Sequence, residues 1–199
     1  MMKYLIAAAA VATLAAPVSA NAVVGQPAPA FTAKDSNGKS VSLADFKGKP
    51  VVLEWTNADC PFVQKHYSSG NMQSLQADAR KSGAVWLTVN SGAPGKQGHV
   101  TGAEANAKVK AQGFGSTAYL LDTDGAIGRA YGAKTTPHMY VIAPDGKLAY
   151  AGGIDDVPTA NPADIAKARP LVKLALADVQ AGKAVETPTS RPYGCSVKY

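Results

Sequence analysis

Short apolar runs and longer segments with helical spacing alternate along this chain of 199 residues, a pattern typical of a β-sheet covered by helices. Residues 51–55 form the clearest predicted strand, because an almost continuous apolar, β-branched run is typical of a strand buried on both faces. Further apolar runs predict strands at 85–89, 119–122, 138–142 and 148–151. Helical spacing predicts helices at 62–81, 101–112, 126–131 and 161–181.

Turn and capping residues refine these boundaries. The Asn37-Gly38 turn signal lies between 31–33 and 41–43 and predicts an N-terminal β-hairpin. Thr101 and Glu104 have the spacing of a capping box that opens a helix. The helix at 62–81 is expected to kink or break around 68–70, whereas the helix at 161–181 is expected to continue past Pro170. Together the elements predict an α/β fold with one sheet and helices on both of its faces.

The first 22 residues have the features of a cleaved secretory signal. Lys3 supplies a positive charge, residues 5–16 are apolar but too few to span a bilayer, and Ala20-Asn21-Ala22 has the small-x-small pattern of a cleavage site. A membrane anchor or a buried N-terminal helix is the alternative. Export predicts a periplasmic or secreted protein, in a compartment where disulfides persist. No later apolar stretch is long enough to span a membrane, so none is expected after cleavage.

Composition and charge exclude several other classes. With 46% hydrophobic and 17% charged residues the chain is expected to be globular rather than disordered. The formal net charge is +6, but lysine and arginine form no run interleaved with aromatic residues, so no nucleic-acid partner is expected. The glycine-rich segment 91–98 lacks the Gly-Lys-Ser/Thr ending of a phosphate loop, which excludes that kind of nucleotide site.

Cys60 is the first candidate for chemistry, since it follows the strand that ends at Trp55 and precedes a predicted helix start at Pro61. Backbone N–H groups and the positive end of the helix dipole favour a thiolate at such a position. Pro61 fits the first helical turn, where its missing N–H costs nothing. Asp59 opposes the thiolate, because a neighbouring negative charge raises a thiol pKa. A small buried hydrophobic residue, or half of a permanent disulfide, is the structural interpretation.

The Thr136-Pro137 pair is the second candidate, because a proline at the start of a sheet strand needs a special backbone geometry that a cis peptide bond would supply. In order along the chain, the hairpin, the strand 51–55, Cys60-Pro61-Phe62, Thr136-Pro137 and the turn 144–147 resemble the thioredoxin superfamily, in particular its redoxin and peroxiredoxin-like branch. The resemblance implies a central mixed sheet flanked by helices, with a nucleophilic Cys60 beside a cis-Pro137 loop and with Trp55, Pro61 and Thr136 in supporting places. It covers 24–153 as a redoxin domain, after a signal at 1–22 and before a C-terminal helix and tail at 154–199.

Two departures from the family pattern limit the chemistry. Thioredoxins carry Cys-x-x-Cys, whereas Val63 stands here in place of the second thiol, so a local redox pair is impossible. Typical peroxiredoxins carry Pro-x-x-x-Thr/Ser-x-x-Cys, whereas Leu53 and Asn57 occupy the first two of these positions before Cys60. Their peroxidatic thiol also aligns with Val63. Because activating a peroxide needs donors fixed around the thiolate, peroxide reduction is not the expected reaction.

Cys195 is the remaining candidate for a partner thiol, since it lies in a tail where Pro192 and Gly194 allow a turn. The predicted function is an exported thiol–disulfide oxidoreductase in which Cys60 attacks and Cys195 resolves the mixed disulfide. The alternative is a non-catalytic binding or structural module stapled by the same bond, which would enclose more than 130 residues and stabilise the fold by about 4 to 5 kcal/mol. A thiol peroxidase with an antioxidant role is the further alternative.

The chain has three histidines, His66, His99 and His138, which together with the two cysteines are the candidates for a Cys/His metal site. They are expected to be solvated or to lie at the edge of the core, since copper-binding relatives of this fold use two nearby cysteines and this chain has none. No metal and no cofactor is therefore expected. The expected partners are protein or small-molecule thiols and disulfides.

Overall fold

A seven-stranded β-sheet forms the centre of the structure, a computed structural model in which residues 22–199 are described. The strand order is β2-β1-β5-β4-β3-β7-β8. Strands β3, β4 and β5 run parallel and the other pairings are antiparallel, so the predicted mixed sheet and N-terminal hairpin are confirmed. The bounds are β1 (Thr32–Asp35), β2 (Ser40–Ser42), β3 (Val51–Trp55), β4 (Val85–Asn90), β5 (Ala118–Leu121), β7 (His138–Ile142) and β8 (Leu148–Gly152).

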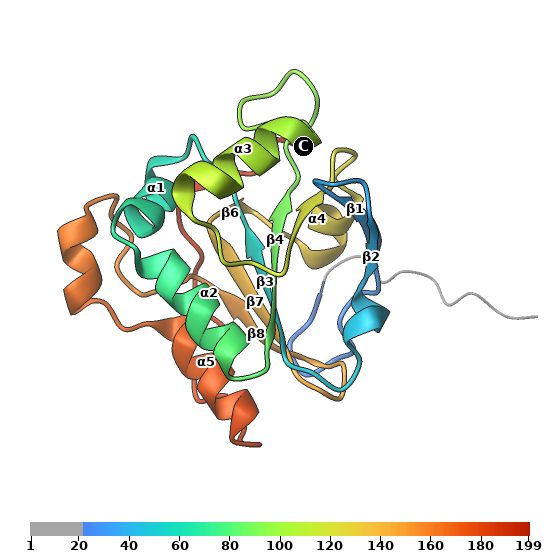
Figure 1. The fold of residues 1–199 in the computed structure, drawn as a ribbon. Helices are drawn as coiled ribbons and strands as arrows, with labels where there is room; N and C mark the ends of the chain where they lie inside the picture. The colour runs from blue at the N-terminus through green and yellow to red at the C-terminus, as the bar shows by residue number, and fades with distance from the viewer. Residues whose placement is uncertain (1–21) are drawn as a thin grey trace, which may run out of the picture.

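Helices cover both faces of this sheet (Figure 1). Helices α1, α2 and α5 pack on one face, and α4 packs on the other together with the N-terminal segment. Ala105 of helix α3 packs with Tyr119 of β5 and with Val100, which lies just before the helix. The bounds are α1 (Pro61–Ser68), α2 (Asn71–Lys81), α3 (Gly102–Gln112), α4 (Ala126–Tyr131) and α5 (Leu171–Gln180), with 3₁₀ turns η1 (Leu43–Phe46) and η2 (Pro162–Lys167).

The central strand β3 is buried along its whole length, as its apolar sequence predicts. Its one charged residue, Glu54, is fully buried and accepts hydrogen bonds from Tyr67 of α1, Gln76 of α2, and Trp86 and Thr88 of β4. Burial raises the pKa of Glu54, and the four donors oppose that rise. The carboxyl group thus ties two helices to the middle of the sheet.

Two local predictions about helices are confirmed. The predicted break falls between α1 and α2, where Gly70 has φ 75°, a left-handed conformation that glycine adopts at low cost. Helix α3 begins with the predicted capping box: the Thr101 hydroxyl accepts from the Glu104 N–H, and the Glu104 carboxylate accepts from the Thr101 N–H.

The predicted continuous helix at 161–181 is wrong. The segment folds instead as the 3₁₀ turn η2 and the separate helix α5, which begins directly after Pro170. Proline lacks the N–H that an interior helical position needs, and it disfavours a helical conformation at the preceding residue. Arg169 accordingly donates its backbone N–H to Asp156 instead of continuing a helix.

The C-terminal tail returns to the sheet through a second, two-stranded sheet, in which β9 (Cys195–Ser196) pairs with β6 (Thr135–Thr136). The predicted signal segment falls on residues 1–21, outside the described part of the chain, apart from Ala22. In the described residues, no helix is both long and apolar enough to cross a membrane. The domain boundaries at 24–153 and 154–199 stay predictions.

Candidate functional site

Cys60 lies at the junction between the central sheet and the first helix. It is the N-cap residue of α1, with Pro61 at the first helical position as predicted, and none of its surface is exposed. The short loop after β3 places it there: the Cys60 N–H donates to the Asn57 carbonyl at 3.0 Å, and the Asp59 N–H donates to the Asn57 side chain at 3.0 Å. The loop therefore fixes the cysteine at the positive end of the helix.

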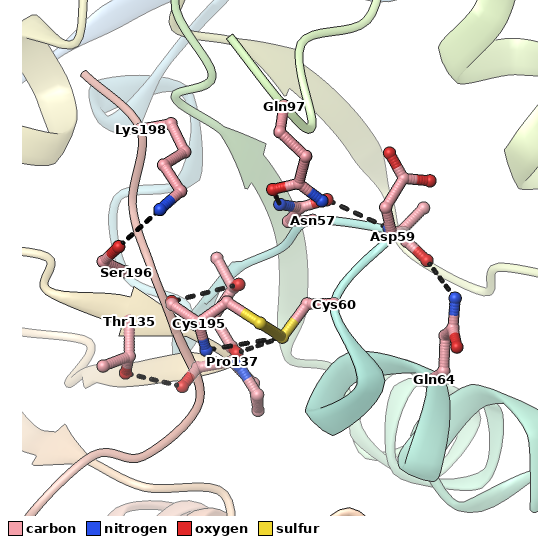
Figure 2. The surroundings of a disulfide bond; sticks show 12 residues. Asn57, Asp59, Cys60, Gln64, Gln97, Thr135, Pro137, Cys195, Ser196 and Lys198 are labelled. Atoms are coloured by element: carbon pink, nitrogen blue, oxygen red, sulfur yellow. Dashed lines mark hydrogen bonds between the residues drawn. A yellow bond between two sulfur atoms is a disulfide. The ribbon is translucent and has the colours of Figure 1, made fainter.

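Cys195 reaches Cys60 from the tail and forms a disulfide with it, as Figure 2 shows. The two residues are 135 positions apart, and their Cα atoms are 6.0 Å apart. Both cysteines of the chain are used in this bond. The expected pairing of Cys60 with Cys195 is therefore present in the structure.

The loop that contains Pro137 lies beside the disulfide, and the Thr136-Pro137 bond is cis, as predicted. The Thr136 carbonyl oxygen is 3.2 Å from Sγ of Cys60, and the Cys195 N–H points at the same sulfur with 3.4 Å between N and Sγ. In a free thiol, the carbonyl could accept the S–H, whereas the N–H could donate to a thiolate. The two groups therefore favour opposite protonation states of Cys60.

The side chains of Asn57 and Asp59 are bonded to groups other than Sγ of Cys60. The Asn57 amide nitrogen donates to Gln97 at 3.0 Å, and a Cβ on Gly98 would collide with the Asn57 side chain. Both ends of the Asn57 amide are thus occupied: the nitrogen holds Gln97 of the loop at 93–99, and the oxygen accepts from the Asp59 N–H. The Asp59 carboxylate points away from the disulfide (Figure 2), is more than half exposed and lies 3.5 Å from Nζ of Lys108.

Trp55 supports the site from the other face of the sheet. Its indole N–H donates to Ser91 at 3.0 Å, and the Ser91 hydroxyl donates to Asp122 at 2.5 Å. Burial raises the pKa of Asp122, although backbone N–H groups of α4 donate to it. Trp55 therefore fixes the end of β3 against β4 and the start of α4.

One comparison decides the family. The model of the AhpC/TSA family matches residues 24–151, which is more than half of the chain. The chain belongs to the AhpC/TSA family. The resemblance expected from the order of motifs is thereby confirmed, and Cys60 and Pro137 lie within the matched residues whereas Cys195 lies beyond them.

Two kinds of relative match parts of this AhpC/TSA protein. Thiol-disulfide oxidoreductase ResA of Bacillus subtilis is 29% identical over 131 residues, which are 62% of this chain and 64% of that protein. Peroxiredoxin Q of Suaeda salsa is 60% identical, but over 35 residues only, which are 18% of this chain and 16% of that protein. The chain thus matches less than two thirds of the length of either relative.

A solved structure resembles nearly the whole chain. A hypothetical protein from Sinorhizobium meliloti has a TM-score of 0.72 and 26% identity, and the superposition covers 90% of this chain and 97% of that one. Because it covers far more of this chain than the 62% covered in the ResA alignment, the tail region is part of a shared architecture rather than an irregular appendage. The thioredoxin-like fold class is confirmed.

The three histidines of this AhpC/TSA protein do not come together. His66 lies in α1 and His138 in β7, both buried, and His99 hydrogen-bonds the Gly92 carbonyl. Burial lowers the pKa of His66 to about 4 and that of His138 to about 3. Within residues 22–199, no three His, Cys, Asp or Glu side chains are grouped in a way that could hold a metal ion.

Sequence reasoning missed a buried polar cluster next to the disulfide, formed by Lys65, His66, Asp155 and Tyr193. The expectation that the histidines are solvated or lie at the edge of the core is wrong for His66 and His138, which are buried against polar partners. Lys65 and His66 interrupt the face of α1 that also carries the buried Val63 and Tyr67. Two polar residues among apolar ones on one helix are a sequence signal for a buried polar contact, but they do not identify the partners, which lie 90 and more positions away.

Proposed function

We propose that this protein is a thiol–disulfide oxidoreductase whose redox couple is Cys60 and Cys195. The observation that carries the proposal is the bond itself, which joins a helix-start cysteine beside the Pro137 loop to a cysteine in a separate tail. The name of the Bacillus relative, a thiol-disulfide oxidoreductase, supports the same class of reaction. The substrates are thiols and disulfides of proteins or small molecules.

In this proposal, the thiolate of reduced Cys60 attacks one sulfur of a substrate disulfide and expels the other sulfur as a thiolate. The Cys195 thiolate then attacks Sγ of Cys60, which forms the bond seen in the structure and releases the second substrate thiol. Two protein thiols are oxidised and one substrate disulfide is reduced. The α1 N-terminus and the Cys195 N–H would stabilise negative charge on Sγ of Cys60, and the Pro137 loop would border the reacting sulfurs.

A structural staple is the second candidate, and the complete burial of Cys60 favours it. A substrate cannot reach Sγ of Cys60 while the tail covers it, so exchange by this atom needs the tail to move. The reduction potential separates the candidates, since structural disulfides lie below about −300 mV and working ones lie above this value. A potential below that range would favour the staple.

The test compares three proteins in their reduced forms with a small aromatic disulfide. We expect the wild type to be oxidised to the Cys60–Cys195 disulfide much faster than Cys60→Ser reacts, because only the wild type can complete both steps. Cys195→Ser should accumulate a mixed disulfide at Cys60, visible by mass mapping. Equal inertness of the wild type and Cys60→Ser would overturn the proposal and favour the staple.

Hydrogen peroxide tests the peroxidase alternative, which the short match to peroxiredoxin Q suggests. We expect the reduced wild type to react with peroxide at the rate of an ordinary thiol. Asn57 occupies the place where typical peroxiredoxins carry Thr or Ser, and its amide is bonded to Gln97 and to the loop instead of facing the sulfur. Fast peroxide turnover that depends on Cys60 would replace the exchange assignment with a peroxidase.

The proposed location is the periplasm or the cell exterior, because the sequence predicts a cleaved signal and a disulfide persists in an oxidising compartment. Sequencing the N-terminus of the protein from its native compartment should find a start near Asn21 or Val23. Intact Met1 would remove both the export and the oxidising context.

A further inference from the structure

The buried polar cluster lies where the Cys195 tail crosses α1. Lys65 and His66 of α1, Asp155 after β8 and Tyr193 of the tail are each less than a tenth exposed. Such groups are costly to bury unless they are paired with one another. Tyr193 is the only one of the four that belongs to the tail, and it stands two residues before Cys195.

The Tyr193 hydroxyl is the centre of the contacts. It donates to Oδ1 of Asp155 at 2.5 Å and lies 3.2 Å from Nε2 of His66. Nζ of Lys65 lies 3.4 Å from the hydroxyl and 3.5 Å from Oδ2 of Asp155. The Tyr193 ring also packs edge-on against Phe62, with 5.8 Å between the ring centroids. The tail thus contributes an aromatic ring and a hydroxyl to a site that α1 and the Asp155 loop have built.

This arrangement places both cysteines relative to the same helix, α1. Cys60 caps the start of α1, and residues 62, 65 and 66 on its first two turns hold Tyr193. The tail strand β9 has only two residues, so its pairing with β6 offers few hydrogen bonds of its own. The tail is also held on either side of Cys195, by Ser190 against Ala151 and by Val197 against Lys134, but Tyr193 supplies the side-chain contacts that dock it on α1, the helix that carries Cys60.

We propose that Tyr193 is a positioning residue that keeps the tail docked on α1 when the disulfide is reduced, so that the tail shields Cys60 and holds Cys195 ready to resolve. This inference rests on the proposed function. It has two consequences of opposite sign. Loosening Tyr193 exposes Cys60 to reagents and speeds its reaction, but it also lowers the effective concentration of Cys195 at Cys60.

The test uses the full chain with both cysteines and the variant Tyr193→Phe, which removes only the hydroxyl. In the reduced protein, the rate at which iodoacetamide alkylates each cysteine is measured by peptide mapping. The equilibrium with glutathione is measured separately, where two protein thiols and one glutathione disulfide give the protein disulfide and two glutathiones. Tyr131→Phe is the matched control, since it also removes a buried tyrosine hydroxyl, which donates to the Pro29 carbonyl away from the tail.

We expect iodoacetamide to alkylate Cys60 about tenfold faster in Tyr193→Phe than in the wild type, and the glutathione equilibrium constant to be about tenfold lower. Tyr131→Phe should change the alkylation rate and the equilibrium constant less than threefold. In the reduced wild type, Cys60 should react more slowly than Cys195, a measurement that needs no variant. Changes of less than threefold in either quantity for Tyr193→Phe, equal reactivity of the two wild-type cysteines, or equal effects in the control would overturn the inference. If exchange continues normally in those cases, the inference fails while the proposed function stands.

Discussion

Cys60 and Cys195 share one bond but are held by two different kinds of structure. The Cys60 region is continuous: β3, a five-residue loop that ends at Cys60, and α1 follow one another in the chain, and the cysteine belongs to the larger apolar core. The Cys195 region is a two-residue strand in a long tail. Its contacts reach β6, α1, the Asp155 loop and the loop at 93, all distant in sequence.

The family match follows the same division. It includes residues 24–151 and so contains Cys60, Pro137 and the central sheet up to the last residue of β8, but it ends before Asp155, Tyr193 and Cys195. The first cysteine of the disulfide is thus supplied by the family domain, and the second is supplied by an extension folded back over it. In a Cys-x-x-Cys protein one helix start provides both thiols, whereas here the second thiol depends on how firmly the tail is docked.

Loss of the disulfide is the strongest way to break this comparison. Reduction of the wild type should lower the free energy of unfolding by about 4 to 5 kcal/mol, because the bond closes a loop of 135 residues. Urea unfolding of the oxidised and reduced protein measures the difference, with Cys195→Ser as an independent form that lacks the bond. A loss below about 1 kcal/mol would show that the bond does not constrain the unfolded chain as this model requires.

A substitution at Gly194 would disturb the docking of the tail while keeping both cysteines. Gly194 has φ 125°, and a Cβ at this position would collide with the carbonyl oxygen of Thr136. We expect Gly194→Ala to weaken tail docking by about 2 to 3 kcal/mol and to lower the glutathione equilibrium constant accordingly. Gly182→Ala is the control, since it also has a positive φ, 67°, but an added Cβ would meet nothing within 4 Å. Equal equilibrium constants for the two variants would contradict the close approach of the tail to β6.

The sequence predicted the Cys60 region well because its determinants are local. The apolar run 51–55, Pro61 at the first helical position and the capping box at Thr101 each act over a few residues, and each is present in the structure. The break at Gly70 belongs to the same class. The wrong prediction of one helix across Pro170 shows the limit of apolar spacing. The apolar residues at 171–179 do form a helix, but the proline ends the helical conformation before it.

The tail could be predicted only in part because its determinants are distant pairings. Two cysteines in a chain predicted to be exported suggested the bond, but nothing near Tyr193 indicates that its hydroxyl meets Asp155, 38 positions earlier, and His66, 127 positions earlier. The residues next to Lys65 and His66 in the sequence do not indicate which distant groups pair with them when they are buried. The physical rule that buried charges are paired predicts that partners exist, but only the fold identifies them.

Acidification should destabilise the protein, because two buried histidines, His66 in α1 and His138 in β7, resist protonation. Burial, and then the positive charge of Lys134, lowers the pKa of His138 to about 3; burial and Lys65 lower that of His66 to about 4 against the opposing effect of Asp155. Since the unfolded chain binds these protons near pH 6.5, their contribution to stability is complete above that pH and is lost as the pH falls towards 4.

We expect each histidine to remove about 2 kcal/mol between pH 6.5 and 5, measured as the free energy of unfolding. His138→Asn keeps an acceptor for the Lys134 N–H. It should remove the part of the pH-dependent loss of stability that His138 causes and leave the part that His66 causes. Parallel pH curves for the wild type and this variant would contradict the assignment to His138.

The smallest expected effect tests whether local stability and tail docking are separate. Thr101→Ala removes the side chain that caps α3, so it should lower the free energy of unfolding by about 1 kcal/mol. Helix α3 packs on Tyr119 and not on α1 or the tail strand, so the glutathione equilibrium constant should stay within twofold of the wild type. Two contacts connect the α3 region to the site: the Ala93 N–H of the loop at 91–100 donates to the Lys198 carbonyl at 2.8 Å, and Nζ of Lys108 lies 3.5 Å from the exposed carboxylate of Asp59. A shift above fivefold in the equilibrium constant would mean that these contacts couple α3 to the site, and that the Cys195 region is held by the family domain more widely than by α1 and β6.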